Sequence, residues 1–270
     1  MKKIDTVKMS ILSALTLTAY IPTFIWMVER WRERDTYYSH GFLVPLICVF
    51  IAWSKRERLK KIAVEPANIG WAFFIIGMAI HTVSALLRIY FSSGFSLLLT
   101  ISGIILLFLG KKFLKELLFP ISFLVSMIPL PLVVIANISF RLKIFASQIS
   151  TIILNYMGIP AVREGSVIKT MHSYLMVEDP CSGIRSLIAL LSLGAIMAYF
   201  SNISKPKKII LFSASMPIAI IANIIRIVSL ALASEMYGEK LATGIFHDAM
   251  GILVFVFAFL GLSFVGKLLE

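Results

Sequence analysis

The sequence contains few of the side chains that build metal centres and covalent scaffolds. Its 270 residues include 2 cysteines and 4 histidines, and their spacing matches neither a disulfide framework nor a structural zinc site. The motifs His-Glu-x-x-His and Gly-x-Ser-x-Gly and the phosphate-binding Walker loop are absent. These absences argue against a zincin-type protease, a hydrolase with a nucleophile elbow and a P-loop nucleotidase. We also find no haem or nucleotide signature, so we expect no cofactor and no metal.

Acidic residues are scarce as well: 14 Asp and Glu stand against 26 Lys and Arg, for a net charge of +12. Such a charge can indicate a nucleic-acid partner. Here, however, the basic residues lie in short loops between apolar runs, as topology signals do. Because 59% of the residues are hydrophobic, the composition predicts the lipid bilayer as a partner and no nucleic acid.

Apolar segments near the spanning length of about 20 residues recur along the whole chain. They predict an all-α integral membrane protein of about eight transmembrane helices, forming a single membrane-embedded domain over residues 1–270. The first segment lacks a small-residue cleavage site, so we expect it to be retained. The predicted spans are residues 9–28, 40–54, 69–89, 92–110, 117–136, 183–201, 208–233 and 247–266.

Three regions depart from this pattern. Pro120, Pro129 and Pro131 interrupt the fifth segment and predict a kink or an early exit. Residues 137–157 mix polar and apolar side chains, so we expect an amphipathic helix lying in the interface. Residues 161–178 predict a short hairpin that covers the membrane face.

Basic clusters predict the orientation, because loops on the cytoplasmic side carry an excess of Lys and Arg. With eight spans and a cytoplasmic N-terminus, every large cluster falls on the cytoplasmic side. The segments 29–39, 89–92, 137–181 and 234–246 then face outward. The clusters comprise Lys2, Lys3, Lys8, Lys55, Arg56, Arg58, Lys60, Lys61, Lys111, Lys112, Lys115, Lys205, Lys207, Lys208 and Lys267.

The polar stretch from Glu178 to Arg185 meets the sixth predicted span and contains Cys181. We expect Asp179 to cap the helix and Pro180 to occupy its first position. Cys181 would then lie in the first turn, where free N–H groups and the helix dipole favour a thiolate. Cys48, by contrast, lies inside an apolar run and is interpreted as a small packing residue.

Two further residues fall at the same predicted depth as Cys181. Arg226 lies 18 residues beyond Lys208, about 27 Å along a helix, and His247 lies 20 residues before Lys267, about 30 Å. A thiol, a guanidinium and an imidazole at the outer edge of the membrane suit amide cleavage or acyl transfer. Cys181 would be the nucleophile and His247 the acid and base.

The remaining groups would support that chemistry. Arg226 would stabilise the oxyanion, assisted by backbone N–H groups near Ser182 and Gly183. Each assignment has an alternative. Arg226 could instead pair with an acidic residue and fasten helices. The base could also be another outward-facing histidine. In that case, or if there is no catalysis, His247 would be an ordinary polar residue at the membrane interface. The acidic residues that could pair with Arg226 are Glu178, Asp179 and Asp248. The histidines that could replace His247 as the base are His40 and His172.

Three blocks of the sequence together resemble the exosortase/archaeosortase family. They are Pro180-Cys181-Ser182-Gly183-Ile184-Arg185-Ser186, Asn223-Ile224-Ile225-Arg226 and His247-Asp248, and the early segment Ser39–Leu46 is similar to the N-terminal region of that family. The resemblance covers about residues 35 to 266.

The resemblance implies a membrane-embedded cysteine transpeptidase or protease of the inner (plasma) membrane, with its active site on the extracytoplasmic side. Its substrates would be membrane-anchored surface proteins with a C-terminal sorting signal, made of a motif, a transmembrane helix and a basic tail. The catalytic residues would be Cys181, Arg226 and His247. Arg185, Ser182, Gly183 and Asn223 would bind substrate.

Two other classes of function remain open from the residues alone. A multi-span transporter or flippase would use Arg226, His81 and the proline-broken fifth segment to line a pathway. A non-catalytic scaffold in the export of an envelope polymer would need none of the three polar residues for chemistry. Neither an inverted repeat nor a pathway through the membrane is visible in the sequence.

Overall fold

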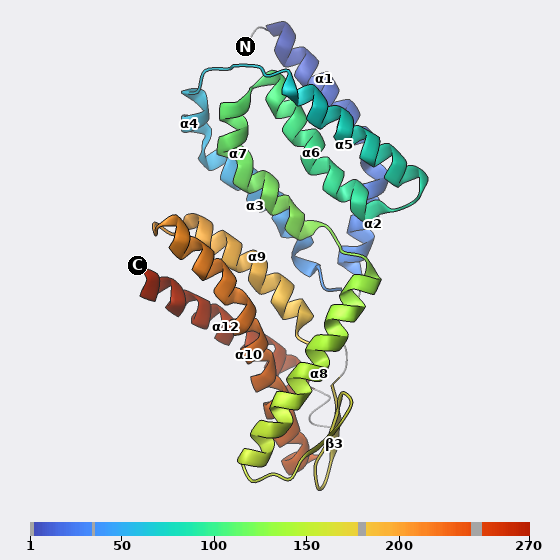
Figure 1. Cartoon of the computed structure of the whole chain (residues 1–270), viewed down its shortest axis with the longest axis vertical. Helices are drawn as coiled ribbons and strands as arrows, with labels where there is room; N and C mark the ends of the chain where they lie inside the picture. The colour runs from blue at the N-terminus through green and yellow to red at the C-terminus, as the bar shows by residue number, and fades with distance from the viewer. Residues whose placement is uncertain (1–2, 34–35, 178–181, 239–244) are drawn as a thin grey trace. The chain divides into compact units, whose positions relative to one another are not determined.

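The computed structural model describes residues 3–33, 36–177, 182–238 and 245–270 (Figure 1), with the side chains of Lys3, Ile245, His247 and Asp248 not included. The described chain is mainly helical and divides into two compact units, Met1–Pro131 and Leu132–Glu270. This division into two compact units does not test the predicted single domain over residues 1–270.

The first unit is a group of packed helices. The α5 and α6 helices form its closest pair, and α6 also packs against α1, α2 and α7, while α3 packs against α7. Its elements are α1 (Lys3–Ala19), α2 (Ile21–Arg32), the 3-10 turn η1 (Ser39–Phe42), α3 (Leu43–Ser54), α4 (Arg56–Lys60), α5 (Ile69–Leu86), α6 (Tyr90–Phe108), α7 (Lys111–Phe123) and the 3-10 turn η2 (Leu124–Met127).

Glycine allows α5 and α6 to approach closely. A Cβ atom at Gly103 would lie 2.5 Å from the backbone nitrogen of Phe74, and one at Gly77 would lie 2.9 Å from the backbone nitrogen of Thr100. Small residues at such contacts let membrane helices gain van der Waals packing, since lipid provides no hydrophobic drive between them.

Buried polar side chains also join the helices of this unit. The Tyr20 hydroxyl lies 2.7 Å from the hydroxyl of Ser96 and 2.9 Å from that of Thr100. The His81 ring stacks on Tyr20, with 3.9 Å between ring centroids, and its Nδ1 lies 2.8 Å from the Ser93 hydroxyl. His81 is therefore a helix-packing residue, because polar groups in an apolar interior need hydrogen-bond partners.

The second unit centres on one long helix, α10 (Lys205–Tyr237). The α8 (Leu132–Tyr156), α9 (Ile184–Phe200) and α12 (Ile245–Leu269) helices all pack against it (Figure 1). Ile227 and Leu230 of α10 are fully or almost fully buried in this core.

A small antiparallel sheet covers the C-terminal end of α10. Its strands are β1 (Val162–Glu164), β2 (Val167–Lys169) and β3 (Tyr174–Met176), in the order β1-β2-β3. Ile168 pairs with Leu175 across the sheet, and both side chains are buried against the helices. The predicted hairpin is confirmed and has a third strand.

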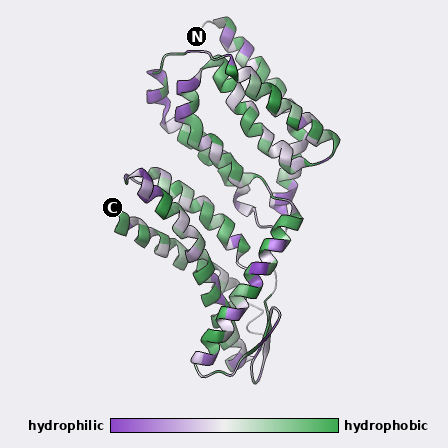
Figure 2. Ribbon diagram, viewed as in Figure 1, coloured by the Kyte–Doolittle hydropathy of each residue, from purple (hydrophilic) through white to green (hydrophobic). Residues whose placement is uncertain are grey.

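Apolar side chains dominate the helix surfaces (Figure 2). Within the described residues, five helices are long and apolar enough to cross a membrane: α5, α6, α8, α10 and residues Ala249–Leu269 of α12. The α1 and α2 helices form a sixth candidate span if they are counted as one helix despite the 54° bend between them. Residues Ser39–Ser54 and α9 form shorter apolar helices, so the chain is a multi-pass membrane protein but eight spans are not confirmed.

The fifth predicted span, residues 117–136, does not form one helix. The α7 helix ends at Phe123, and α8 begins directly after Pro131. Pro129 and Pro131 explain this break, because proline lacks the N–H group and keeps the residue before it out of the helical conformation. The predicted interfacial helix, residues 137–157, is instead the main part of α8, which is itself long enough to cross a membrane.

Candidate functional site

The α9 helix (Ile184–Phe200) begins one residue after the start of the predicted sixth span, 183–201. Gly183 occupies the capping position with φ = 81°, in the left-handed region, and the helix starts at Ile184. The expected cap at Asp179 and the expected first position at Pro180 fall outside the described residues, so both stay predictions. Cys181 lies outside the described residues, together with Glu178, Asp179 and Pro180.

Gly183 lies directly against the side chain of Asn223 on α10. A Cβ atom at Gly183 would lie 2.7 Å from Cγ and 2.8 Å from Nδ2 of Asn223, and Asn223 is 3% exposed. The absence of a side chain at position 183 thus allows the first turn of α9 to touch α10. Ser182, beside it, is also buried, and its Oγ accepts a hydrogen bond from the N–H of Ile184.

Arg226 lies three residues beyond Asn223 and so on the same side of α10. Its side chain is 8% exposed. The guanidinium lies against the start of α12, where a Cβ atom at Gly251 would be 3.6 Å from Nη2 of Arg226. His247 precedes Gly251 by four residues, so its Cα lies about one helical turn away along the same helix. The His247 side chain is outside the described part.

A small cavity adjoins this contact within the second unit. Its volume, counted as the space that the centre of a water molecule can occupy, is about 10 Å³. This volume is near the minimum needed to hold one water. Its walls come from α8, the start of α9 and α10. The lining residues are Leu142, Ala146, Ser182, Gly183, Leu187, Ala219, Ile220 and Asn223.

The structure therefore brings together most of the described residues that the sequence singled out. Ser182, Gly183, Asn223 and Arg226 lie along the contact between α9, α10 and α12. Arg185 follows in the first turn of α9 and is half-buried. Within the described residues, no three or more His, Cys, Asp and Glu side chains are grouped so that they could hold a metal ion.

The rival histidines have partners elsewhere. His172 Nδ1 lies 2.8 Å from a carboxylate oxygen of Glu235. In the first unit, His40 Nε2 lies 3.2 Å from the carbonyl oxygen of Ser126. Cys48 is buried, and its thiol donates to the carbonyl of Pro120, in agreement with its predicted packing role. These contacts favour structural roles for all three side chains.

Glu235, near the end of α10, is a residue that the sequence analysis missed. Its carboxylate accepts hydrogen bonds from the Thr170 hydroxyl at 2.5 Å and from the His172 backbone N–H at 3.3 Å, in addition to its contact with the His172 ring. Glu235 thus ties the turn between β2 and β3 to α10. The available signal was one acidic residue near the end of a long apolar segment.

The transmembrane exosortase family model matches residues 31–264 of the chain. No curated protein and no solved structure matches it significantly. The matched residues include all the described members of the candidate site and extend over both compact units.

Replacing Gly183 with alanine tests the close contact with Asn223. Gly183→Ala should lower the melting temperature more than Gly158→Ala does. Both glycines have nearly the same φ, 81° and 83°, but a Cβ at Gly158 would meet nothing within 4 Å. The backbone penalty is therefore shared, and the difference isolates the contact. Equal melting temperatures in a thermal unfolding assay would show that the contact is loose.

Proposed function

The chain belongs to the transmembrane exosortase family of sortase-like membrane transpeptidases, and from this premise we propose that it is a cysteine transpeptidase or protease. It would cleave the C-terminal sorting signals of membrane-anchored surface proteins through an acyl-enzyme at Cys181. Arg226 and His247 would complete the catalytic group. The reaction would take place at the extracytoplasmic side of the inner (plasma) membrane.

One observation supports this proposal above all: the meeting of α9, α10 and α12 at Gly183, Asn223, Arg226 and Gly251. Cys181 is two residues from Gly183, and two residues of chain span at most about 7 Å. His247 is one helical turn from Gly251. Covalent connection and helix register would thus keep the thiol and the imidazole within reach of the buried guanidinium, and this is the support for the proposal.

The chemistry would proceed in two steps. The Cys181 thiolate attacks the scissile carbonyl carbon, the carbon–nitrogen bond breaks, and the amine leaves with a proton from His247. This step leaves the substrate joined to Sγ as a thioester. An acceptor, either water or an amine, then gives its proton to His247, attacks the thioester carbon and releases the thiolate.

Arg226 has the properties needed beside the reacting carbonyl. The guanidinium keeps its charge at any physiological pH and offers five N–H donors in one plane. In a buried site, where water screens little, such donors stabilise an oxyanion strongly. The adjoining Asn223 amide and the backbone N–H groups of Ser182 and Gly183 would orient the substrate, and Arg185 would contact it at the mouth of the site.

The depth of the site suits a substrate with a membrane anchor. Arg226 is 21 residues from the start of α10, about 31 Å along the helix, which is close to the thickness of the hydrocarbon core. With the lysine-rich start of α10 on the cytoplasmic side, Arg226 would lie at the outer edge of the core. A substrate helix whose basic tail is in the cytoplasm would present the residues just outside its helix at this level.

Trapping the acyl-enzyme tests the nucleophile. The purified protein is incubated with a membrane-anchored candidate substrate, and intact-mass spectrometry should find a thioester at Cys181. Cys181→Ala should abolish both the thioester and the processing. Cys48→Ser should retain them, because the Cys48 thiol only donates to the Pro120 carbonyl, a contact that serine can reproduce. Substrate processing that persists in Cys181→Ala would rule out this mechanism.

Changing the guanidinium to an ammonium tests Arg226. Arg226→Lys should slow processing about 100-fold or more, the usual effect of losing one oxyanion donor, because a point charge cannot replace a planar fork. Arg141→Lys is the matched control, since Arg141 lies on an exposed position of α8, and it should process at the wild-type rate. A folded Arg226→Lys protein with full activity would contradict the assigned role.

A further inference from the structure

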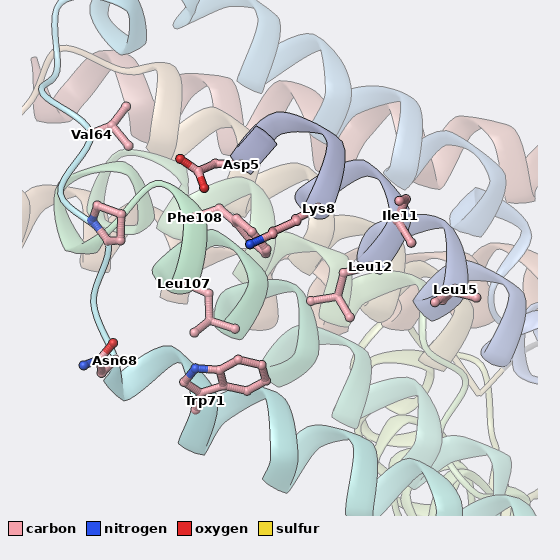
Figure 3. Close-up of a pocket in the computed structure, with 11 residues that line it drawn as sticks. Asp5, Lys8, Ile11, Leu12, Leu15, Val64, Asn68, Trp71, Leu107 and Phe108 are labelled. Carbon is pink, nitrogen blue, oxygen red and sulfur yellow. The ribbon is translucent and has the colours of Figure 1, made fainter. Parts of the chain in front are cut away.

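The first unit contains a groove between α1 and the beginning of α5 (Figure 3). Its volume is about 840 Å³, toward the upper end of the roughly 300–1,000 Å³ range of ligand pockets. The floor of the groove is apolar, and the wall along α1 carries both charged and apolar side chains. Ile11, Leu12, Leu107, Phe108 and Trp71 supply most of the apolar surface.

Two opposite charges stand at the polar end of this groove. Asp5 and Lys8 lie three residues apart on α1, and Figure 3 shows both side chains beside the groove, with the Lys8 ammonium above its apolar floor. Neither side chain has an ion-pair partner among the described residues. Asn68, from the loop before α5, adds an amide on the far side. The polar end thus carries an anion, a cation and a neutral donor.

The position of the groove relates it to the membrane surface. It is bordered by residues 64–68, which follow the basic α4 helix (Arg56–Lys60), and by the end of α6. Trp71 is half-exposed at its edge, and tryptophan prefers the level of the lipid headgroups. The charged end therefore lies at headgroup level on the lysine-rich side, with the apolar floor extending toward the acyl chains.

The geometry points to a bound phospholipid whose headgroup is zwitterionic and ends in a primary ammonium, such as phosphatidylethanolamine. Lys8 would bind its phosphate and Asp5 its ammonium, with an acyl chain along the apolar floor. A carboxylate accepts charge-assisted hydrogen bonds from a primary ammonium, but a quaternary ammonium has no N–H to donate. An anionic headgroup would satisfy Lys8 and be repelled by Asp5. This inference does not rest on the proposed catalytic function.

Lipid retention by the full-length protein tests this site. The protein is reconstituted in vesicles with equal parts of phosphatidylethanolamine, phosphatidylcholine and phosphatidylglycerol, extracted gently, and its bound lipids are measured by mass spectrometry. Phosphatidylethanolamine should be enriched several-fold over the vesicle composition. Asp5→Asn should reduce that enrichment to the level of phosphatidylcholine, and Lys8→Gln should weaken retention of all three phospholipids.

The matched control is Lys111→Gln, which removes a positive charge at the exposed start of α7, outside the groove, and should leave the enrichment unchanged. Melting temperatures near that of the wild type would show that the variants are folded. The site is disproved if the wild type enriches no lipid, if phosphatidylglycerol is enriched most, or if Asp5→Asn keeps the preference. Occupation of the groove by a second copy or by a protein helix would give the first of these results.

Discussion

A guanidinium that cannot lose its proton is held in the interior of the second unit, where Arg226 is 8% exposed. Placing Arg226 in an apolar region is costly unless the surrounding groups solvate it. The unit accommodates it by bringing three helices close together. Glycine at 183 lets the start of α9 reach Asn223, and the guanidinium lies beside Gly251 of α12, where an added Cβ would be at an ordinary contact distance of 3.6 Å. A larger residue at position 183 would push the start of α9 away from Asn223.

The sheet completes this arrangement at the C-terminal end of α10. Glu235 binds the turn between β2 and β3 through Thr170 and His172, and the buried Leu175 packs β3 against the helices. The chain that leaves β3 reaches Ser182 and Gly183 after a short connection. Both ends of this connection are thus attached to the helix that carries Arg226. The nucleophile proposed for this connection would have a limited region in which it can lie, which is the condition for a preorganised site.

Hydropathy and motif spacing predicted much of this molecule. Apolar runs predicted the segments that form α5, α6, α10 and α12, and alternating residues predicted the hairpin region. Both patterns depend on local sequence. The break at Pro129 and Pro131 was also predictable, but its consequence was not. Leu132 could equally have ended the preceding span or begun a new one, and only tertiary packing on α10 decides that α8 is one continuous helix.

In the candidate site, too, some features follow from the local sequence and others depend on contacts between residues far apart in the sequence. The motif blocks singled out Gly183, Asn223 and Arg226, and the structure brings the first two into contact; their functional roles stay predictions. The left-handed conformation of Gly183 and its contact with Asn223, 40 residues away, cannot be derived from the local sequence. The Glu235 contact with Thr170 and His172 likewise joins residues more than 60 positions apart, which no local pattern can reveal.

The closeness of Cys181 to His247 is the central claim, and disulfide trapping measures it most directly. In a Cys48→Ser background, His247→Cys should form a disulfide with Cys181 on mild oxidation, because such bonds need Cα atoms within about 7 Å. Ala249→Cys, on another side of α12, should form little or none. Rapid and selective bonding of Cys181 with position 247 is the result that this account predicts. Its absence in folded protein, or equal bonding to position 249, would contradict it.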